Sequence, residues 1–479
     1  MRQILINVEP YEKRVAITYR GALEEFYIER SDQPRMAGNI YKGTIESVVP
    51  GIGALFLNIG TGKNGFLYIR DLEEKTSPAP GAPQPGRLKK GEVLLVQVAK
   101  EPIGTKGPLL TTDISLPGKY LVLMPFSDTL GISKRIEDIR QRSSLKEVLE
   151  KLKLPKGIGC IARTESLGAS PRQLKLEVRY LMNLWSRIRY RAEGQKAPSL
   201  IYEEYDLPLR IIRDHLYEEV GRILVDSREE YKKISRFANS IQPKLRRKIF
   251  YYREKTPLYE KYAIEERIEE IFHRKIFLKS GGSIVIEKTE GLIAVDVNTG
   301  KFTGKRDPEE TAFKTNMEAA QEVARQVMLR DIGGIIVIDF IDMSKKAHQR
   351  EVRAALENAF KRDKARIKIS AVSAIGLIEM TRQRIRKSLE SVSFRECPYC
   401  TGTGSVKTPA TIVIETVRRL ERRLWEGRSR EILLRAHPDV AECLATSFKN
   451  ILRTLERKSG KKITVKVDSK LHVEDVYFE

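Results

Sequence analysis

Two short apolar segments each carry an aspartate at a position where it could do chemistry. Asp296 lies within residues 294–298 and Asp339 within residues 335–342. Side chains alternate between the two faces of a strand, so each aspartate shares a face with apolar neighbours, and Asn298 lies on the same face as Asp296. An ionised carboxylate in such surroundings is costly unless a cation or a hydrogen-bond network compensates for it. The two segments therefore predict a site for a hard metal ion.

A hard ion at this place would suit the hydrolysis of a phosphodiester. Mg²⁺ is commonly held by one or two carboxylates, keeps several of its waters and neutralises charge on a phosphate. Asp296 and Asp339 are the expected ligands, and the amide of Asn298 is expected to orient them. Taken singly, each aspartate has an ordinary alternative as a strand-end cap or turn former, and their occurrence on two adjacent predicted strands favours the metal site. Asp342 falls on the opposite face from Asp339 and is expected to be structural.

Cys397 and Cys400, separated by two residues, form the other arrangement with recognisable chemistry. Such a pair is either a metal knuckle or a redox pair. Structural Zn²⁺ usually takes four protein ligands, and Cys160 and Cys443 belong to other predicted domains, so a partner chain is the simplest source of the missing thiolates. A free or redox-active pair remains the alternative, although no thioredoxin-like βαβ unit precedes it.

Composition indicates the kind of partner. The 479 residues include 87 Lys and Arg against 64 Asp and Glu, a formal charge of +23, which favours a polyanion such as RNA, DNA or an acidic membrane surface. The length predicts about three or four domains. No apolar run approaches the length of a membrane span and the N-terminus lacks the form of a secretory signal, so we expect a cytosolic protein without a disulfide framework.

The elements that must position these residues begin with a predicted all-β region. Residues 1–35 are expected to form a two-stranded segment, and a small Greek-key barrel of the OB type is expected from strand-like runs separated by glycine turns, at 40–49, 54–59, 66–69 and 93–99. The Pro-rich stretch 76–86 is expected to be a loop at its rim. Phe56, Phe66 and Lys106 would suit single-stranded RNA, because aromatic rings stack on bases near cations. The two phenylalanines could equally belong to the core.

Helices and strands mix in the remainder. Apolar residues at helical spacing after Pro171 predict an amphipathic helix with its core stripe at Leu174, Val178, Leu181, Trp185 and Ile188. Residues 201–278 are helix-rich, and 279–395 alternate between strands and helices, including a strand at 334–342 and a helix after 366–372. An Arg-rich helix at 381–387 is expected to be a solvated basic face. Residues 408–479 are expected to form a small α/β domain with two helices and closing strands.

These motifs, in this order, resemble the ribonuclease E/G family of bacterial endoribonucleases. The residues that carry the resemblance are 4–7, 39–43, 104–107, 110–112, 120–125, 163–164, 280–286, 296–298, 310–313, 334–343 and 397–404. The resemblance spans essentially the whole chain. Because the sequence ends soon after the small C-terminal domain, without a long Pro- and Arg-rich tail, it is similar to the shorter form found in the family. A scaffold for other degradation enzymes is therefore not expected.

The resemblance implies a multidomain fold of α/β and α+β type, with an OB-type RNA-binding barrel, a ribonuclease H-like region, a DNase I-like catalytic domain and a small C-terminal α/β domain. The implied boundaries are 1–35 for the first part of the ribonuclease H-like region, 36–117 for the barrel, 118–278 for a 5′-sensor and the rest of that region, 279–395 for the catalytic domain, 396–407 for a zinc link and 408–479 for the small domain.

The resemblance also implies an activity and a set of site residues. It implies a Mg²⁺-dependent endoribonuclease of rRNA maturation and mRNA decay that leaves 5′-phosphate and 3′-hydroxyl ends and favours 5′-monophosphorylated RNA. The implied sites are catalytic Asp296, Asp339 and Asn298; RNA-binding Phe56, Phe66 and Lys106; a 5′-phosphate pocket at Gly118, Val122, Arg163 and Thr164; and Zn²⁺ shared between subunits of a homodimer or higher oligomer by Cys397 and Cys400. From the residues alone, Arg163 and Thr164 would be an ordinary surface pair. A catalytically silent RNA-binding or chaperone protein is the alternative function, and a DNA nuclease is disfavoured by the barrel.

Overall fold

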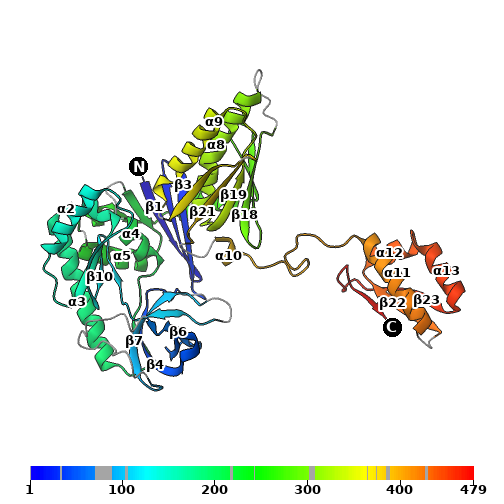
Figure 1. Cartoon of the computed structure of the whole chain (residues 1–479), viewed down its shortest axis with the longest axis horizontal. Coiled ribbons are helices and arrows are strands. Elements are labelled where there is room, and N and C mark those ends of the chain that lie inside the picture. The colour runs from blue at the N-terminus through cyan, green and yellow to red at the C-terminus, as the bar shows by residue number, and fades with distance from the viewer. Residues whose placement is uncertain are drawn as a thin grey trace. The chain divides into compact units, whose positions relative to one another are not determined.

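The computed structural model describes residues 2–32, 35–70, 89–102, 106–215, 220–241, 243–300, 308–363, 365–373, 375–384, 389–426 and 430–479. The chain forms two compact units, Met1–Leu389 and Glu390–Glu479 (Figure 1). The expected rim loop at 76–86 lies outside the described residues, as do parts of the turn before Lys106 and of the Arg-rich stretch.

The first sheet joins segments that are far apart in the sequence. Its order is β15-β14-β1-β2-β3, with β1 antiparallel to β2 and parallel to β14. The strands are β1 (Arg2–Val8), β2 (Glu12–Tyr19), β3 (Ala22–Arg30), β14 (Val220–Val225) and β15 (Ile249–Tyr251). The N-terminal segment thus has three strands where two were predicted, because residues 22–30 continue the meander. Helices α4 (Leu207–His215) and α5 (Arg228–Ile241) add Leu209, Ile212 and Ile234 to the core of this sheet.

A five-stranded closed barrel follows, confirming the expected barrel architecture. The sheet order is β13-β4-β5-β6-β8-β7, and β4 also pairs with β7, which closes the ring. The strands are β4 (Ile40–Val49), β5 (Ala54–Asn58), β6 (Gly65–Tyr68), β7 (Val93–Lys100), β8 (Leu109–Thr111) and, outside the ring, β13 (Ser199–Tyr202), with a 3₁₀ turn η1 (Pro50–Ile52). Alternate residues such as Leu55, Leu57 and Leu67 fill the interior.

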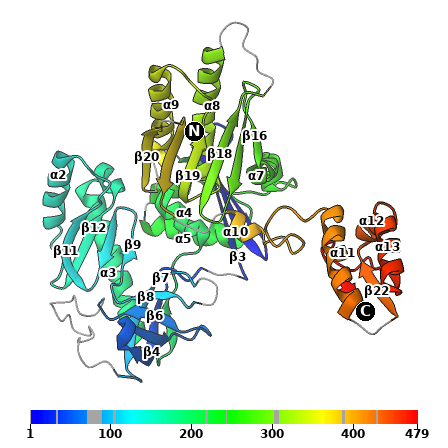
Figure 2. The same cartoon turned by 45° about the vertical axis from the view of Figure 1, so that its right-hand side comes forward.

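A four-stranded sheet, with order β11-β12-β10-β9, lies beside a long helix. Its elements are β9 (Leu116–Pro117), β10 (Leu121–Met124), β11 (Ser127–Ile132), α2 (Ile139–Glu150), β12 (Ile158–Ala162), η2 (Thr164–Gly168) and α3 (Pro171–Gly194). The predicted helix is present: Ser170 caps its start, and four residues of the predicted stripe are buried, with Val178 partly buried. Helix α3 runs from this sheet toward the barrel (Figures 1 and 2), where Lys42 donates hydrogen bonds to Ala192 O and Gln195 O.

The next sheet carries the acidic segments. Its order is β16-β17-β18-β19-β21-β20, and helices α8 and α9 cover one face (Figure 2). The elements of this layer are β16 (Lys275–Phe277), β17 (Ser283–Lys288), β18 (Leu292–Asn298), α8 (Pro308–Leu329), β19 (Gly334–Asp339), α9 (Lys346–Ala359), η4 (Phe360–Arg362), β20 (Ile367–Val372) and β21 (Leu377–Arg382). Before them in the chain come η3 (Pro243–Lys248), α6 (Leu258–Lys261) and α7 (Ile264–Phe272), whose buried residues pack in the cores of the first sheet. The predicted strand at 334–342 therefore ends three residues early, at Asp339.

The prediction of a helix after residue 372 is wrong. Residues 377–382 form β21, in which Ile378, Met380 and Arg382 are buried in alternation. Arg382 is not part of a solvated basic face, because its guanidinium donates to Asp363 at 2.7 Å and to Asp331 at 2.9 Å, with all three side chains at most 5% exposed. Burial along this segment therefore repeats every second residue, as in a strand, and not every 3.6 residues, as in the predicted helix. Arg382 can occupy a buried position of the strand because the two aspartates neutralise its charge.

The second unit contains a three-stranded sheet of order β23-β22-β24. Its elements are α11 (Pro409–Glu426), β22 (Glu431–Ala436), α12 (Pro438–Ala445), α13 (Lys449–Ser459), β23 (Lys462–Val467) and β24 (Val476–Phe478), and the short helix α10 (Leu389–Ser393) lies at the boundary of the two units. The expected α/β class is present, with three helices where two were predicted. No helix among the described residues has the length and apolarity needed to cross a membrane.

Candidate active site

The two aspartates lie side by side. Strands β18 and β19 are parallel neighbours, and their register pairs Asp296 directly with Asp339. The side chain of Asn298 donates a hydrogen bond from Nδ2 to Asp296 Oδ2 at 2.7 Å. Directly opposite residues on neighbouring strands point to the same face, so the two carboxylates and the amide form one cluster at the carboxyl end of this strand pair.

The carboxylates lie on the open face of the sheet. Asp296, Asn298 and Asp339 are exposed, whereas the alternate residues of both strands are buried under α8 and α9. Their apolar neighbours on the open face are exposed too, since Ile335 is 52% and Leu292 37% accessible. The prediction that these carboxylates sit in an apolar, desolvated setting is therefore wrong. Their significance rests on their pairing in register rather than on a cost of burial.

Helix α8 fixes the chain immediately after Asp339. Asn316 is fully buried, and its amide both donates to Ile341 O at 2.8 Å and accepts from Ile341 N at 3.0 Å. Nearer the start of α8, Glu309 accepts hydrogen bonds from Ser344 N and Oγ at 2.8 and 2.6 Å. Hydrogen bonding by Ser344, above all, lowers the pKa of Glu309 to about 2, so the contact persists throughout the neutral range.

Asp342 does not share a strand with Asp339. Strand β19 ends at Asp339, and Asp342 lies exposed in the following segment, where its Oδ1 lies 3.3 Å from the position a Cβ would take on Gly376. The prediction that Asp342 lies on the opposite face of the strand from Asp339 is therefore wrong, because Asp342 follows the end of β19. Among the described residues, no three His, Cys, Asp or Glu side chains are grouped to hold a metal ion. Any ion here would rely on the pair and on water or phosphate oxygens.

The barrel carries an aromatic cluster on its outer surface. Phe56 and Phe66 are cross-strand partners with ring centroids 5.6 Å apart, and Phe66 also meets Tyr68 edge-on at 4.8 Å. The rings are half-buried and alternate with the interior leucines, so they are not the barrel core. The guanidinium of Arg70 lies 4.6 Å from the Tyr68 ring centroid. Tyr68 and Arg70 were missed by the sequence analysis, although the spacing of two from Phe66 could have indicated Tyr68.

Lys106 is exposed in the segment that leads into β8. The adjoining Gly107 lies so close to the chain that a Cβ there would come within 1.9 Å of Asn64 O, and only glycine permits this approach. Phe66 N then donates to Pro108 O at 2.8 Å, and β6 pairs with β8. The backbone on the C-terminal side of Lys106 is therefore held against the start of β6, the strand that carries Phe66.

Gly118 and Arg163, two residues of the expected phosphate pocket, come together. Arg163 Nη1 donates to Gly118 O at 2.5 Å, and Arg163 N donates to Tyr120 O at 2.8 Å. Thr164 follows at the start of η2, where its hydroxyl contacts Glu165 Oε2 at 3.1 Å. The half-buried Val122 lies one strand away, on β10, and pairs with Pro117 next to Gly118.

Glu177, on α3, fixes the backbone that follows Gly118. Its carboxylate accepts hydrogen bonds from the backbone N–H groups of Lys119, Tyr120 and Leu121, at 2.6 to 2.8 Å. A Cβ on Gly118 would lie 2.7 Å from the Glu177 carboxyl carbon, so glycine is required there. Burial raises the pKa of Glu177 against the opposing effect of those three N–H donors. Glu177 could not be identified from sequence, because a buried glutamate in a helical stripe shows no local signal of its distant backbone partners.

Cys397 and Cys400 lie in a tight turn of the second unit, where Cys397 is exposed. Gly404 N lies 3.3 Å from Cys400 Sγ, and hydrogen bonds from Gly404, then Gly402, lower the pKa of the Cys400 thiol. Positive φ angles at Thr401, Gly402 and Gly404 turn the backbone N–H groups toward the sulfur. Backbone donors of this kind favour the thiolate form that metal binding requires.

Comparison with known proteins gives consistent matches along the chain. The profile of the ribonuclease E/G family matches residues 115–385, and a profile described as the thioredoxin-like domain of RNase E/G matches residues 396–479. Ribonuclease G of Escherichia coli K12 is 39% identical over 474 residues, which cover 97% of each chain. Ribonuclease G of Haemophilus influenzae is 37% identical over 97% of this chain and 96% of its own. Ribonuclease E of Escherichia coli K12 is 39% identical over 96% of this chain but 44% of its own.

Proposed function

Because this chain belongs to the ribonuclease E/G family and is accordingly an endoribonuclease, we propose that it cuts single-stranded RNA with Mg²⁺ held between Asp296 and Asp339. The observation that carries the proposal is the direct register pairing of these two aspartates, with Asn298 bound to one of them. The substrates we infer are rRNA precursors and mRNA in the cytoplasm. A catalytically silent RNA-binding protein would have no need for such a pair.

The donor set fits Mg²⁺. This ion is usually bound through one or two carboxylates and completes its octahedron with waters and substrate phosphate, so two exposed aspartates are sufficient. Metal dependence is expected of this family in general, and the hard oxygen donors are what favour Mg²⁺ over softer ions. When bound, the ion supplies Lewis acidity toward a water molecule and toward the phosphate oxygens.

Each residue of the site has a separate role in the proposed cleavage. The two carboxylates hold the charge that binds the ion, Asn298 keeps Asp296 from rotating, and Asn316 fixes the segment beyond Asp339. We propose that water attacks the phosphorus opposite O3′, that the P–O3′ bond breaks, and that a proton passes to O3′. The products are a 5′-phosphate and a 3′-hydroxyl. The exposed setting of the pair leaves room for an extended RNA strand.

The domain likenesses are part of the same proposal. The sheet β15-β14-β1-β2-β3 with α4 and α5 supports a ribonuclease H-like region, and the six-stranded sheet covered by α8 and α9 supports a DNase I-like catalytic domain. We also propose that the exposed Cys397–Cys400 knuckle shares Zn²⁺ with a second copy of the chain. A homodimer would supply two RNA sites, so one subunit could hold an end while the other cuts.

The central experiment incubates the purified protein with one RNA carrying either a 5′-monophosphate or a 5′-triphosphate, with Mg²⁺ or EDTA. We expect cleavage only with Mg²⁺ and faster cleavage of the monophosphorylated form. Mapping of the product ends checks the chemistry. Cleavage in EDTA would refute the metal mechanism, and 2′,3′-cyclic phosphate ends would refute the water attack.

We expect Arg163→Ala to remove most of the advantage of monophosphorylated over triphosphorylated RNA. The guanidinium can fork onto phosphate oxygens, and alanine removes this cation, whose Nη1 lies 2.5 Å from Gly118 O. The measurement is the ratio of initial rates on the two RNAs, with a circular RNA of the same sequence as a substrate that has no 5′ end. The matched control is Arg189→Ala on the exposed face of α3. Equal loss on all three RNAs would assign Arg163 a folding role instead.

We expect Phe56→Ala and Phe66→Ala to weaken single-stranded RNA binding while the fold persists. Stacking of a base on an aromatic ring contributes about 1–3 kcal/mol, so each variant should bind roughly 5- to 150-fold less tightly. Fluorescence anisotropy with a labelled oligonucleotide in EDTA measures the Kd. The control is Tyr11→Ala, because Tyr11 is 81% exposed and lies outside the barrel. Lower thermal stability with unchanged binding would indicate that the two rings only pack against each other.

A further inference from the structure

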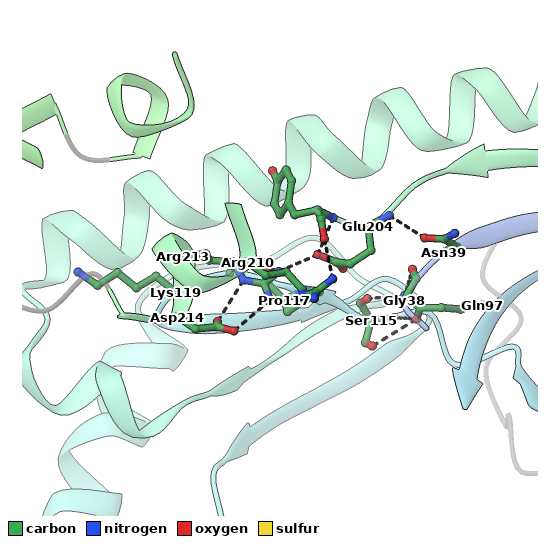
Figure 3. Close-up of polar contacts among 12 residues, drawn as sticks. Gly38, Asn39, Gln97, Ser115, Pro117, Lys119, Glu204, Arg210, Arg213 and Asp214 are labelled. Carbon is green, nitrogen blue, oxygen red and sulfur yellow. Dashed lines mark hydrogen bonds and ion pairs between the residues drawn. The ribbon is translucent and has the colours of Figure 1, made fainter. Parts of the chain in front are cut away.

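The guanidinium of Arg163 is already paired with a carboxylate of this chain. Asp214, near the end of α4, places Oδ1 3.0 Å from Arg163 Nη1 and 3.1 Å from Arg213 Nε. One carboxylate oxygen therefore serves two guanidinium groups. Figure 3 shows Asp214 beside Arg213, and its dashed lines join Arg213 to Asp214 and to Glu204.

Asp214 is held in place from its buried side. Arg213 is 7% exposed, donates to Glu204 Oε1 at 2.8 Å, and lies within 3.3 Å of Pro117 O next to the pocket. Arg163, the other partner of Asp214, is partly exposed: the side chains of Arg163 and Asp214 are 25% and 26% accessible, against 7% for Arg213. Of the two guanidinium groups bound to Asp214, the one a ligand can reach is therefore that of Arg163.

The carboxylate stays ionised at neutral pH. Burial alone would raise the pKa of Asp214, but the charges of Arg213 and then Arg163 outweigh it and lower the pKa to about 2. A second acid is close, because Glu165 Oε2 lies 3.7 Å from Arg163 Nε. An incoming phosphate thus meets one accessible guanidinium flanked by two acidic side chains.

We propose that Asp214 is a specificity-determining residue of the 5′ pocket, whose carboxylate holds Arg163 in the absence of RNA and repels a 5′-triphosphate more than a 5′-monophosphate. The inference rests on the proposed 5′ pocket and adds a mechanism of selection to it. A terminal monophosphate shares Arg163 with Asp214. A triphosphate brings additional negative charges to the same carboxylate, and like charges that come together on binding disfavour the complex.

The test is the substitution Asp214→Asn, which keeps the size of the side chain and removes its charge. We expect the triphosphorylated RNA to be cut about two- to fivefold faster relative to the monophosphorylated RNA, the size expected for one partly exposed charge contact. Asp214→Glu, which restores the carboxylate, should restore the preference of the parent. Raising the salt concentration should weaken the preference of the parent more than that of Asp214→Asn, because salt screens the repulsion.

Asp206→Asn is the matched control. Asp206 precedes the same helix and is also paired, but with Lys13 and Lys233 rather than with the pocket. The inference is overturned if Asp214→Asn leaves the rate on monophosphorylated RNA divided by the rate on triphosphorylated RNA unchanged, or raises this ratio. It is also overturned if the variant lowers cleavage of circular RNA to the same extent as that of the linear RNAs. A parent enzyme without any 5′ preference would instead refute the proposed pocket. A parent whose preference is lost in Arg163→Ala but kept in Asp214→Asn would refute only the role of Asp214.

Discussion

Asp296→Asn and Asp339→Asn are each expected to abolish RNA cleavage while RNA binding is retained. Asparagine keeps the shape of the side chain but removes one of the two charges that hold the ion, and the paired register leaves no described third carboxylate grouped with them. We expect a rate loss of about a hundredfold or more at saturating Mg²⁺, which corresponds to about 2.7 kcal/mol of transition-state stabilisation. Binding should persist, because it depends on basic and aromatic contacts elsewhere.

Single-turnover cleavage and anisotropy on the same RNA separate the two effects. Glu287→Gln is the matched control, because Glu287 lies on neighbouring strand β17, is exposed, and pairs with Arg274 instead of approaching the aspartates. A variant of either aspartate that cleaves within about tenfold of the parent would exclude that residue as a ligand. Loss of cleavage together with loss of binding would indicate a damaged fold.

The two acidic positions could be predicted from sequence because each lies in a short apolar segment whose strand pattern is local. Strand alternation places Asp296 and Asn298 on one face, and two neighbouring apolar segments are enough to bring Asp339 beside them. Whether that face of the sheet is covered by helices or exposed to solvent could not be predicted. Apolar residues such as Ile335 lie on the exposed side, and only the packing of α8 and α9 on the other side decides which face is covered.

The residues that sequence reasoning missed act through distant partners. Asn316 binds the backbone of Ile341, Glu177 binds three N–H groups more than fifty residues away, and Asp214 binds Arg163 at a separation of 51. None of them forms a local motif, so only the tertiary structure reveals the contact. Arg382 gives the opposite error. The sequence predicts a basic helix at Arg382, whereas the structure has a strand there, because the two aspartates that neutralise the arginine lie 19 and 51 residues away.

The double variant Cys397→Ser/Cys400→Ser is expected to convert a zinc-linked dimer into monomers. The turn supplies two thiol groups, and hydrogen bonds from Gly404 and Gly402 favour the thiolate of Cys400. A structural zinc site is usually a closed tetrahedron of four protein ligands, and no group of three candidate ligands exists among the described residues. A second copy of the same turn is the simplest way to complete the site, which requires about half a zinc per chain.

Light scattering and metal analysis on the parent and the variant check the two halves of this prediction together. The parent should have twice the mass of the variant, and the zinc should disappear with the cysteines. Cys443→Ser is the control, because Cys443 is a half-buried thiol on α12 and should leave mass and metal unchanged. A monomeric parent, or a dimer with much less than half a zinc per chain, would refute the shared site. A dimer that survives in the double variant would assign assembly to another surface, since loss of the metal would then not separate the subunits.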